Sequence, residues 1–128
     1  MRALVVDDTM CLRHILLHML RDFGFAEVEE AADGMHALKL VKAHPFDLVI
    51  TDLNMPKLDG LALLKQIRSN PFTTDLPVLM ITSAADKEHL TQAIRADVSG
   101  FLAKPFNQNA LEKQLKRIGF KTKPEKVS

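Results

Sequence analysis

The sequence predicts an α/β fold in which five parallel strands form a doubly wound sheet with five helices. Short apolar runs that suit buried strands alternate with segments whose apolar residues recur at helical spacing. Each helical segment is long enough for one crossover connection, which favours strands that all run in the same direction. The chain has 128 residues, of which 47% are hydrophobic, and this is enough for one domain with a core of its own.

The first strand and helix follow from two periodicities near the N-terminus. Residues 3–6 form a continuous apolar run that ends at Asp7 and Asp8. A helix is then predicted by apolar residues at intervals of three and four positions, namely Leu12, Ile15, Leu16, Met19, Leu20 and Phe23. Gly24 ends that helix, and a weaker run at residues 26–31 predicts the second strand.

The second helix and the third strand come next. The helix carries a stripe of apolar residues at Met35, Ala37, Leu38 and Val41. It must end by His44, because Pro45 disfavours helical angles in the residue before it. Residues 47–52 predict the third strand, whose β-branched apolar run is typical of a strand buried on both faces. Pro56 then forces a loop, which leaves Asp52 at the exit of the strand.

The second half of the chain repeats this scheme. It predicts, in order, a helix begun by Asp59-Gly60 and closed by Asn70-Pro71, a strand at residues 77–82, a helix at 86–95, a strand at 99–103 and a helix capped by Asn107. The helix at residues 86–95 is the more polar one, and we expect it to be only partly buried. Residues 1–119 should form one domain, followed by a frayed basic tail at residues 120–128.

Polar residues follow the carboxyl ends of four predicted strands. Parallel strands share one direction, so these residues fall at the same edge of the sheet: Asp7, Asp8, Asp52, Thr82 and Lys104. In a sheet of order 2-1-3-4-5, a crevice opens between strands one and three, where the order reverses. We therefore expect Asp7, Asp8 and Asp52 to meet there.

Three carboxylates in one crevice require a compensating positive charge. Two unit charges about 4 Å apart repel by roughly 4 kcal/mol at an effective dielectric constant near 20. Lys104 can supply one such charge. A divalent cation can supply more, and a site made of oxygen ligands suits Mg²⁺ better than Zn²⁺. The backbone carbonyl of Asn54, two residues beyond Asp52, can turn toward the same ion.

Such a site suits the transfer of a phosphoryl group to an aspartate. An ionised Asp52 beside Mg²⁺ and Lys104 can attack a phosphoryl group, while the hydroxyl of Thr82 donates a hydrogen bond to it. The product would be an acyl phosphate.

Charge and cysteine content exclude several classes of function. The formal net charge of +1 gives no strongly basic face, so we expect no nucleic-acid partner. The single cysteine, Cys11, cannot form an internal disulfide, and the chain has neither an apolar leader nor a run of about 18 apolar residues. We therefore expect a cytoplasmic protein that does not enter a membrane.

Four motifs lie at these strand ends in a fixed order. They are Val-Val-Asp7-Asp8, Thr-Asp52-Leu-Asn-Met-Pro-Lys-Leu-Asp-Gly60, Met-Ile-Thr82-Ser and Phe-Leu-Ala-Lys104-Pro105-Phe. Together they resemble the receiver domain of two-component response regulators over residues 3–118, and most closely the stand-alone chemotaxis receivers of the CheY type. Each motif alone is modest, but four in this order are strongly specific. The resemblance implies a flavodoxin-like fold.

The resemblance implies that Asp52 accepts a phosphoryl group from a sensor histidine kinase. Such a signalling protein catalyses only its own phosphorylation and dephosphorylation. The implied Mg²⁺ site consists of Asp7, Asp8, Asp52 and the backbone carbonyl of Asn54. The implied phosphoryl ligands are Thr82 and Lys104, and the switch pairs Thr82 with an aromatic residue on the fifth strand, here Phe101.

Some positions depart from the family pattern, and two others are those that set the lifetime of the phosphoryl group in this family. Phe101 replaces the usual Tyr and has no hydroxyl, which could favour an inward position in the resting protein. Asp97-Val98 replaces the usual Gly-Ala before the fifth strand. Asn54 and Ala84 occupy the two positions that tune phosphoryl lifetime. Ala84 leaves the approach to the phosphate open and Asn54 can hold a water in line, so we expect dephosphorylation that is not unusually slow.

An output surface is implied on the fourth helix, fifth strand and fifth helix. Its candidate residues are Lys87, Leu90, Phe101, Lys113, Gln114 and Arg117. Their basic character suits an acidic target peptide, and the expected partners are a flagellar motor switch protein and a phosphatase. The alternative is that the basic residues only solvate the last helix and favour its C-terminal dipole.

Three other functions would place different demands on the sequence. A phosphatase or phosphotransferase of the haloacid dehalogenase type would need an acid two residues beyond the nucleophile, where Asn54 stands. A flavin or nucleotide binder would need a glycine-rich loop after the first strand, where Asp8-Thr9-Met10 stands. A receiver in a phosphorelay unrelated to chemotaxis stays open, as do the kinase, the target and the oligomeric state.

Overall fold

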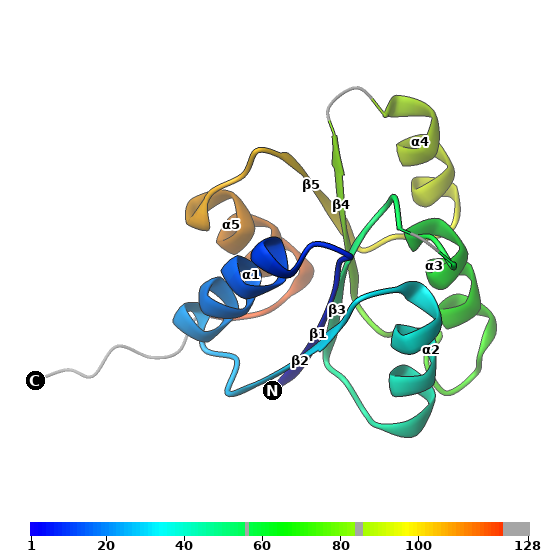
Figure 1. Cartoon of the computed structure of the whole chain (residues 1–128), viewed down its shortest axis with the longest axis horizontal. Helices are drawn as coiled ribbons and strands as arrows, with labels where there is room; N and C mark the ends of the chain where they lie inside the picture. The colour runs from blue at the N-terminus through cyan, green and yellow to red at the C-terminus, as the bar shows by residue number, and fades with distance from the viewer. Residues whose placement is uncertain (56, 84–85, 122–128) are drawn as a thin grey trace, which may run out of the picture.

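The computed structural model describes residues 1–55, 57–83 and 86–121. Its strands are β1 (Arg2–Val6), β2 (Glu27–Ala31), β3 (Leu48–Asp52), β4 (Val78–Ser83) and β5 (Gly100–Lys104). Its helices are α1 (Met10–Phe23), α2 (Gly34–Ala43), α3 (Gly60–Ser69), α4 (Lys87–Arg95) and α5 (Gln108–Ile118). All strand pairs are parallel and follow the order β2-β1-β3-β4-β5, which confirms the predicted doubly wound fold (Figure 1). No helix in these ranges combines the length and apolar character needed to cross a membrane.

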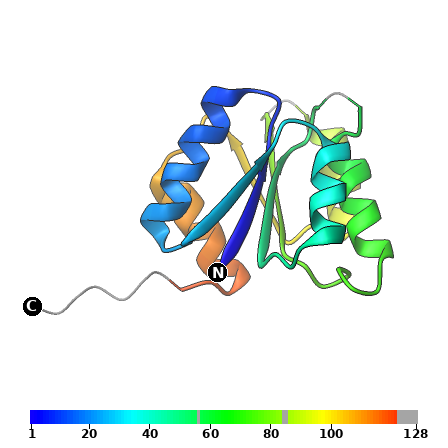
Figure 2. The same ribbon diagram turned by 60° about the horizontal axis from the view of Figure 1, so that its bottom comes forward.

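The helices cover the sheet in two layers. Helices α1 and α5 lie on one face, and α2, α3 and α4 lie on the other (Figure 1). The turned view shows the strands between these layers (Figure 2). Strand β3 occupies the centre of the sheet, and all of its residues are buried. Each fully buried aliphatic side chain contributes about 1.5–3 kcal/mol, so β3 is a firmly packed support for Asp52 at its end.

Aspartate or asparagine side chains cap the N-termini of three helices. Asp33, Asp59 and Asn107 each accept a hydrogen bond from the backbone N–H three residues on, at 2.8, 2.8 and 2.9 Å. Such a cap contributes about 1 kcal/mol. The cap on α5 confirms the prediction for Asn107. Asp86 occupies the equivalent position before α4 but makes no side-chain capping hydrogen bond.

Two glycines let the loop between β3 and α3 pack closely on its neighbours. A Cβ atom on Gly34, the first residue of α2, would overlap the backbone carbonyl of Leu58. A Cβ atom on Gly60 would overlap the backbone carbonyl of Asp52. The loop that follows Asp52 therefore lies in backbone contact with α2, and a residue with a side chain at position 34 would separate the two.

Three apolar residues are placed differently from the sequence prediction. Ile15 and Met35 belong to the predicted apolar stripes but are 49% and 46% exposed, because those stripes are wider than the arc of each helix that the sheet covers. Phe120, predicted as part of a frayed tail, packs on Phe25 with ring centroids 5.3 Å apart, and its N–H donates to the carbonyl of Leu115 at 2.9 Å. The packed part of the domain thus passes the predicted boundary. The predicted tail from residue 122 onward lies outside the described residues.

Arg68 joins three segments at the edge of the sheet where β4 and β5 begin. Its guanidinium donates to the backbone carbonyls of Asp97, Thr74 and Leu76 at 2.9, 3.1 and 2.6 Å. A fourth hydrogen bond runs to the hydroxyl of Ser99 at 3.2 Å. Burial lowers the pKa of the Arg68 guanidinium, and neighbouring carboxylates partly offset this. One side chain thereby connects α3, the loop before β4 and the turn before β5.

A residue in the left-handed conformation, Asp97, follows the end of helix α4. Asp97 has a φ of 68°, and its N–H donates to the carbonyl of Ile94 at 3.1 Å. The N–H of Val98 donates to the carbonyl of Ala93 at 3.1 Å. This is a normal helix end of the type that usually carries glycine, so the sequence departure at Asp97-Val98 leaves its shape intact.

We expect Asp97→Gly to raise the free energy of unfolding by about 0.5–1 kcal/mol, because glycine adopts a positive φ without the steric cost of a Cβ atom. The exchange retains the hydrogen bond from Arg68 to the backbone of residue 97, and it removes the attraction between Arg68 and the Asp97 carboxylate, which is weak because Asp97 is exposed. Urea unfolding followed by circular dichroism measures the change. Asp97→Ala is the control and should give no gain, whereas a less stable glycine variant would contradict the expectation.

Candidate functional site

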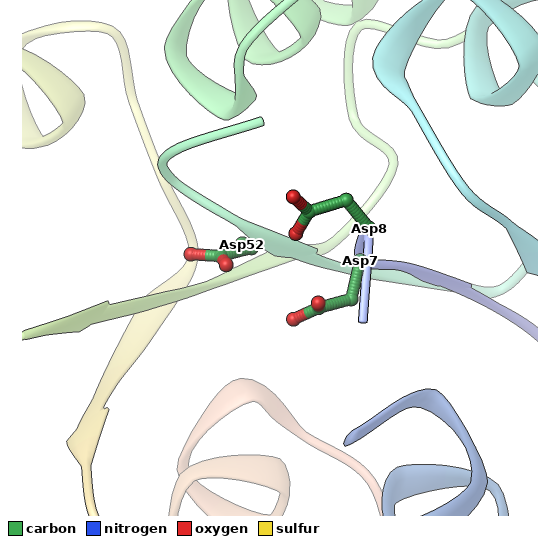
Figure 3. Close-up of side chains that lie close together, drawn as sticks. All are labelled: Asp7, Asp8 and Asp52. Atoms are coloured by element: carbon green, nitrogen blue, oxygen red, sulfur yellow. The ribbon is translucent and has the colours of Figure 1, made fainter. Parts of the chain in front are cut away.

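Three carboxylates gather at the carboxyl ends of two adjacent strands. Asp7 and Asp8 follow β1, and Asp52 ends β3, which pairs with β1 in parallel. One carboxylate oxygen from each of the three lies within 4.8 Å of those of the other two (Figure 3). Asp7 and Asp52 are buried, whereas Asp8 is exposed. The structure thus brings these residues together, as the topology predicts.

Asp7 is the most constrained member of the cluster. Its Oδ1 accepts a hydrogen bond from the N–H of Thr9 at 2.7 Å, and its backbone carbonyl accepts one from Arg13 at 2.6 Å. Burial raises the pKa of the Asp7 carboxyl; the Thr9 hydrogen bond opposes this, and the charge of Asp52 adds to it. The Asp7 Oδ2 atom is buried and has no hydrogen-bond partner among the described residues. An additional positive group would therefore find an unused acceptor here.

Asp52 has two contacts that come from different segments. The Nζ atom of Lys104, at the end of β5, lies 3.1 Å from Asp52 Oδ2. The backbone N–H of Asn54 donates to Asp52 Oδ1 at 3.3 Å. The lysine thus reaches the carboxylate across the end of β4, which lies between β3 and β5 in the sheet. One cation and one backbone amide thus face the two oxygens of this carboxylate.

Thr82 lies at the same edge but does not contact Asp52 through a hydrogen bond. It sits on β4 and is buried, and its hydroxyl donates to the backbone carbonyl of Ser83 at 3.2 Å. The predicted hydrogen bond from this hydroxyl to a bound phosphoryl group would require it to leave that carbonyl. Ala84, the other predicted lifetime position, lies outside the described residues.

The Asn54 side chain points to a residue that the sequence analysis did not single out. Its Nδ2 atom donates to Asp86 Oδ2 at 3.4 Å, and Asp86 Oδ1 lies 2.7 Å from Nδ1 of His89. Burial alone would raise the pKa of the Asp86 carboxyl, but the hydrogen bonds from His89 and Asn54 outweigh it and lower the pKa. The only signal in the sequence is the three-residue spacing of Asp86 and His89, which places them one helical turn apart.

Arg13 is a second residue that the sequence analysis missed. Besides its hydrogen bond to the carbonyl of Asp7, its Nε atom pairs with Glu30 of β2 at 3.3 Å. It therefore holds the segment after β1 against the neighbouring strand. The helical pattern of α1 gave no indication of this, because Arg13 falls on a polar position of that pattern.

The donor set fits a hard divalent cation. The three side chains offer only carboxylate oxygens, the ligand type that Mg²⁺ and Ca²⁺ prefer. The unpartnered, buried Asp7 Oδ2 is an acceptor that such an ion would satisfy. The described residues of this cluster include no histidine or cysteine, the ligands that zinc sites usually contain. The cluster could therefore hold a metal ion of the magnesium type.

The predicted output residues lie along α4, β5 and α5, but not all of them face solvent. Lys87, Lys113 and Arg117 are exposed. Leu90 is half-buried, and half-buried Phe101 packs against the core on the α2, α3 and α4 side of the sheet. Gln114 is also half-buried; its Oε1 atom is buried, and a Cβ atom on Gly100 would lie 2.9 Å from it.

The fold and the site together define a class of protein: a doubly wound domain whose acidic cluster surrounds an aspartate that a lysine contacts. The chain belongs to the response regulator receiver domain family, whose model matches residues 3–116. This agrees with the resemblance carried by the four sequence motifs.

Individual relatives point to the CheY type within this family. The chain is 44% identical over 118 residues to the chemotaxis protein CheY-3 of Vibrio cholerae, covering 92% of this chain and 91% of that protein. The crystal structure of CheY4 of the same organism has a TM-score of 0.84 and 37% identity, covering 91% and 97% of the two chains. The receiver domain of a Pseudomonas aeruginosa sensor histidine kinase, crystallised with a magnesium ion coordinated in the active site cleft, has a TM-score of 0.82 and 27% identity, covering 93% and 98%.

Proposed function

We propose that this chain acts as a response regulator that accepts a phosphoryl group from a sensor histidine kinase onto Asp52 in the cytoplasm. One observation carries the proposal: the buried Asp52 carboxylate lies 3.1 Å from Lys104 and within 4.8 Å of the oxygens of Asp7 and Asp8. A nucleophile, a cation and an acidic pair thus converge at one edge of the sheet. The rival phosphatase function has no such support, because Asn54 stands where its second acid would be needed.

The transfer step follows from the contacts of Asp52. A carboxylate oxygen of Asp52 attacks the phosphorus of a phosphohistidine, an acyl phosphate bond forms, and the P–N bond breaks as the imidazole leaves with its electron pair. The ammonium of Lys104 offsets charge on the phosphoryl oxygens. Asp7, Asp8, Asp52 and the backbone carbonyl of Asn54 would hold Mg²⁺, which when bound supplies further neutralisation of that charge.

The switch in this proposal joins Thr82 and Phe101. A phosphoryl oxygen carries more charge than the Ser83 carbonyl that now accepts from Thr82, so it is the better acceptor for that hydroxyl. Phe101 is half-buried and lies on β5 two residues before Ala103, the partner of Thr82 in the β4–β5 pair, so movement of Thr82 would change the packing of Phe101. Because Phe101 has no hydroxyl, its inward position would leave no polar atom without a partner.

The output in this proposal is chemotaxis, through the face formed by α4, β5 and α5. The support is the similarity to chemotaxis proteins of the CheY type and the exposed cations Lys87, Lys113 and Arg117. These three side chains suit an acidic target segment, such as one on a flagellar motor switch protein or on a phosphatase that ends the signal. A receiver in another phosphorelay would keep the same site and differ only in this face.

Incubation with acetyl phosphate and Mg²⁺ tests the site. The native chain should shift on a phosphate-affinity gel, and Asp52→Asn should abolish the shift because the amide cannot act as the nucleophile. Asp59→Asn is the matched control: Asp59 is an exposed aspartate that caps α3, and asparagine also caps helices, so this variant should shift like the native chain. A shift that persists in Asp52→Asn would place the acceptor elsewhere.

A further inference from the structure

We propose that Asp86 is a positioning residue for the side chain of Asn54, and that this contact shortens the lifetime of the phosphoryl group on Asp52. The inference depends on the proposed function of Asp52 and adds to it a residue outside the acidic cluster. A continuous series of contacts links Asp52 to α4. Asp52 Oδ1 accepts from the N–H of Asn54, the Asn54 carboxamide donates to Asp86, and Asp86 contacts His89 on α4.

The orientation of the Asp86 side chain is unusual for its place in the chain. The aspartates that precede α2 and α3, Asp33 and Asp59, use their carboxylates to cap their own helices. Asp86 precedes α4 but makes no side-chain capping hydrogen bond. Its two oxygens are directed instead to His89 at 2.7 Å and to Asn54 at 3.4 Å. The carboxylate is therefore available to hold a residue of another loop.

The contact fixes which end of the Asn54 carboxamide faces which group. The Nδ2 atom is directed to Asp86, so the carbonyl oxygen of the same amide is left to accept a hydrogen bond from a water molecule. Asn54 is exposed, and its backbone N–H donates to Asp52 Oδ1, so the residue lies beside the carboxylate that would carry the phosphoryl group. In the proposal, a water on this amide oxygen approaches the acyl phosphate. Without Asp86 the amide can rotate freely, and the water is aligned less often. Hydrolysis should then slow.

The same loop has a second side-chain contact that serves as a comparison. Lys57 pairs with Asp33 at 3.5 Å, on the side of the loop that faces α2. This pair holds the loop but does not touch Asn54. If general loosening of the loop governs hydrolysis, removing either contact should have similar effects. If the orientation of the Asn54 amide governs the rate of hydrolysis, removing Asp86 should have no further effect in a protein that already lacks the Asn54 side chain. Removing Lys57 from that protein should keep its own separate effect.

A double-mutant cycle on the decay of phosphorylated protein distinguishes these cases. Asp86→Ala should lower the decay constant roughly two- to tenfold, the kinetic equivalent of one modest hydrogen bond. Asn54→Ala should lower it at least as much, and the double variant should decay like Asn54→Ala alone. Lys57→Ala combined with Asn54→Ala should instead show the product of the two single effects. An Asp86→Ala protein that decays at the native rate or faster, or effects of Asp86 and Asn54 that multiply, would overturn the proposal.

A second measurement does not require phosphorylation. The side-chain NH₂ resonances of Asn54 in ¹⁵N-labelled protein should shift in Asp86→Ala and stay in place in Lys57→Ala, with thermal unfolding of both variants close to native. Unchanged resonances in Asp86→Ala would overturn the contact itself. A native chain that takes up no phosphoryl group on Asp52 would instead refute the proposed function, while the NMR result would still decide whether Asp86 orients Asn54.

Discussion

We expect Asp7→Asn to raise the free energy of unfolding by about 1–2 kcal/mol at neutral pH in buffer that contains EDTA. Asp7 is buried, lies beside two other carboxylates and has one oxygen without a partner. An asparagine keeps an oxygen for the N–H of Thr9 and removes the buried charge. The same variant should weaken Mg²⁺ binding at least about tenfold, because it removes a charged ligand. Urea unfolding and a Mg²⁺ titration followed by NMR measure the two effects.

The gain in unfolding free energy from Asp7→Asn should be larger at neutral pH than at acidic pH. The pKa of Asp7 is raised above its usual value of 3.8, so the folded protein holds the proton more tightly than the unfolded chain does. The native protein therefore loses stability as the pH rises from 3.8 through the raised pKa of Asp7. The advantage of Asp7→Asn should be full above the raised pKa and should fade as pH falls toward 3.8.

Asp8→Asn is the control for this experiment. Asp8 belongs to the same cluster but is exposed, so its exchange should weaken Mg²⁺ binding with a smaller change in stability. An Asp7→Asn protein that is less stable than the native chain in EDTA, or one that binds Mg²⁺ as tightly, would contradict the interpretation of Asp7.

The second large effect is expected at Arg68. Arg68→Ala should lower the free energy of unfolding by about 2–4 kcal/mol, because it removes four hydrogen bonds from a charged donor and leaves the partly buried carbonyl of Leu76 without this donor. Arg68→Lys should recover only part of the loss, since one ammonium cannot match the fixed geometry of the guanidinium. Urea unfolding of both variants measures this. Equal stability of the lysine variant and the native chain would show that charge rather than geometry is responsible.

The sequence was sufficient to predict the parallel strands and the sheet edge at which Asp7, Asp8 and Asp52 meet. Both follow from rules that act on the whole chain: alternating strand and helix patterns imply parallel strands, and parallel strands end at one edge. Lys104 was assigned to the same edge because it ends the fifth predicted strand, and in the structure it contacts Asp52 there. Positions after the carboxyl ends of strands can therefore be assigned without coordinates.

The contacts of Arg68, Asp86 and Arg13 could not be predicted in this way. Each depends on the direction of a long or flexible side chain toward a backbone group or loop that is remote in the sequence. Hydrophobic periodicity fixes only the side of a helix that is buried. The exposed positions of Ile15 and Met35 have the same origin, because the pattern does not give the width of the covered face.

The backbone overlap that only glycine avoids at position 34 has a mechanical consequence. Leu58 and the start of α2 touch through main-chain atoms, so the loop after Asp52 and α2 must shift as one body. On its other side the loop contacts Asp86, which precedes α4, through a side-chain hydrogen bond from Asn54, and this bond costs less to break than a main-chain overlap costs to form. The loop is therefore held more rigidly on the α2 side than on the α4 side. A movement that starts at Asp52 should displace the loop first where it faces α4.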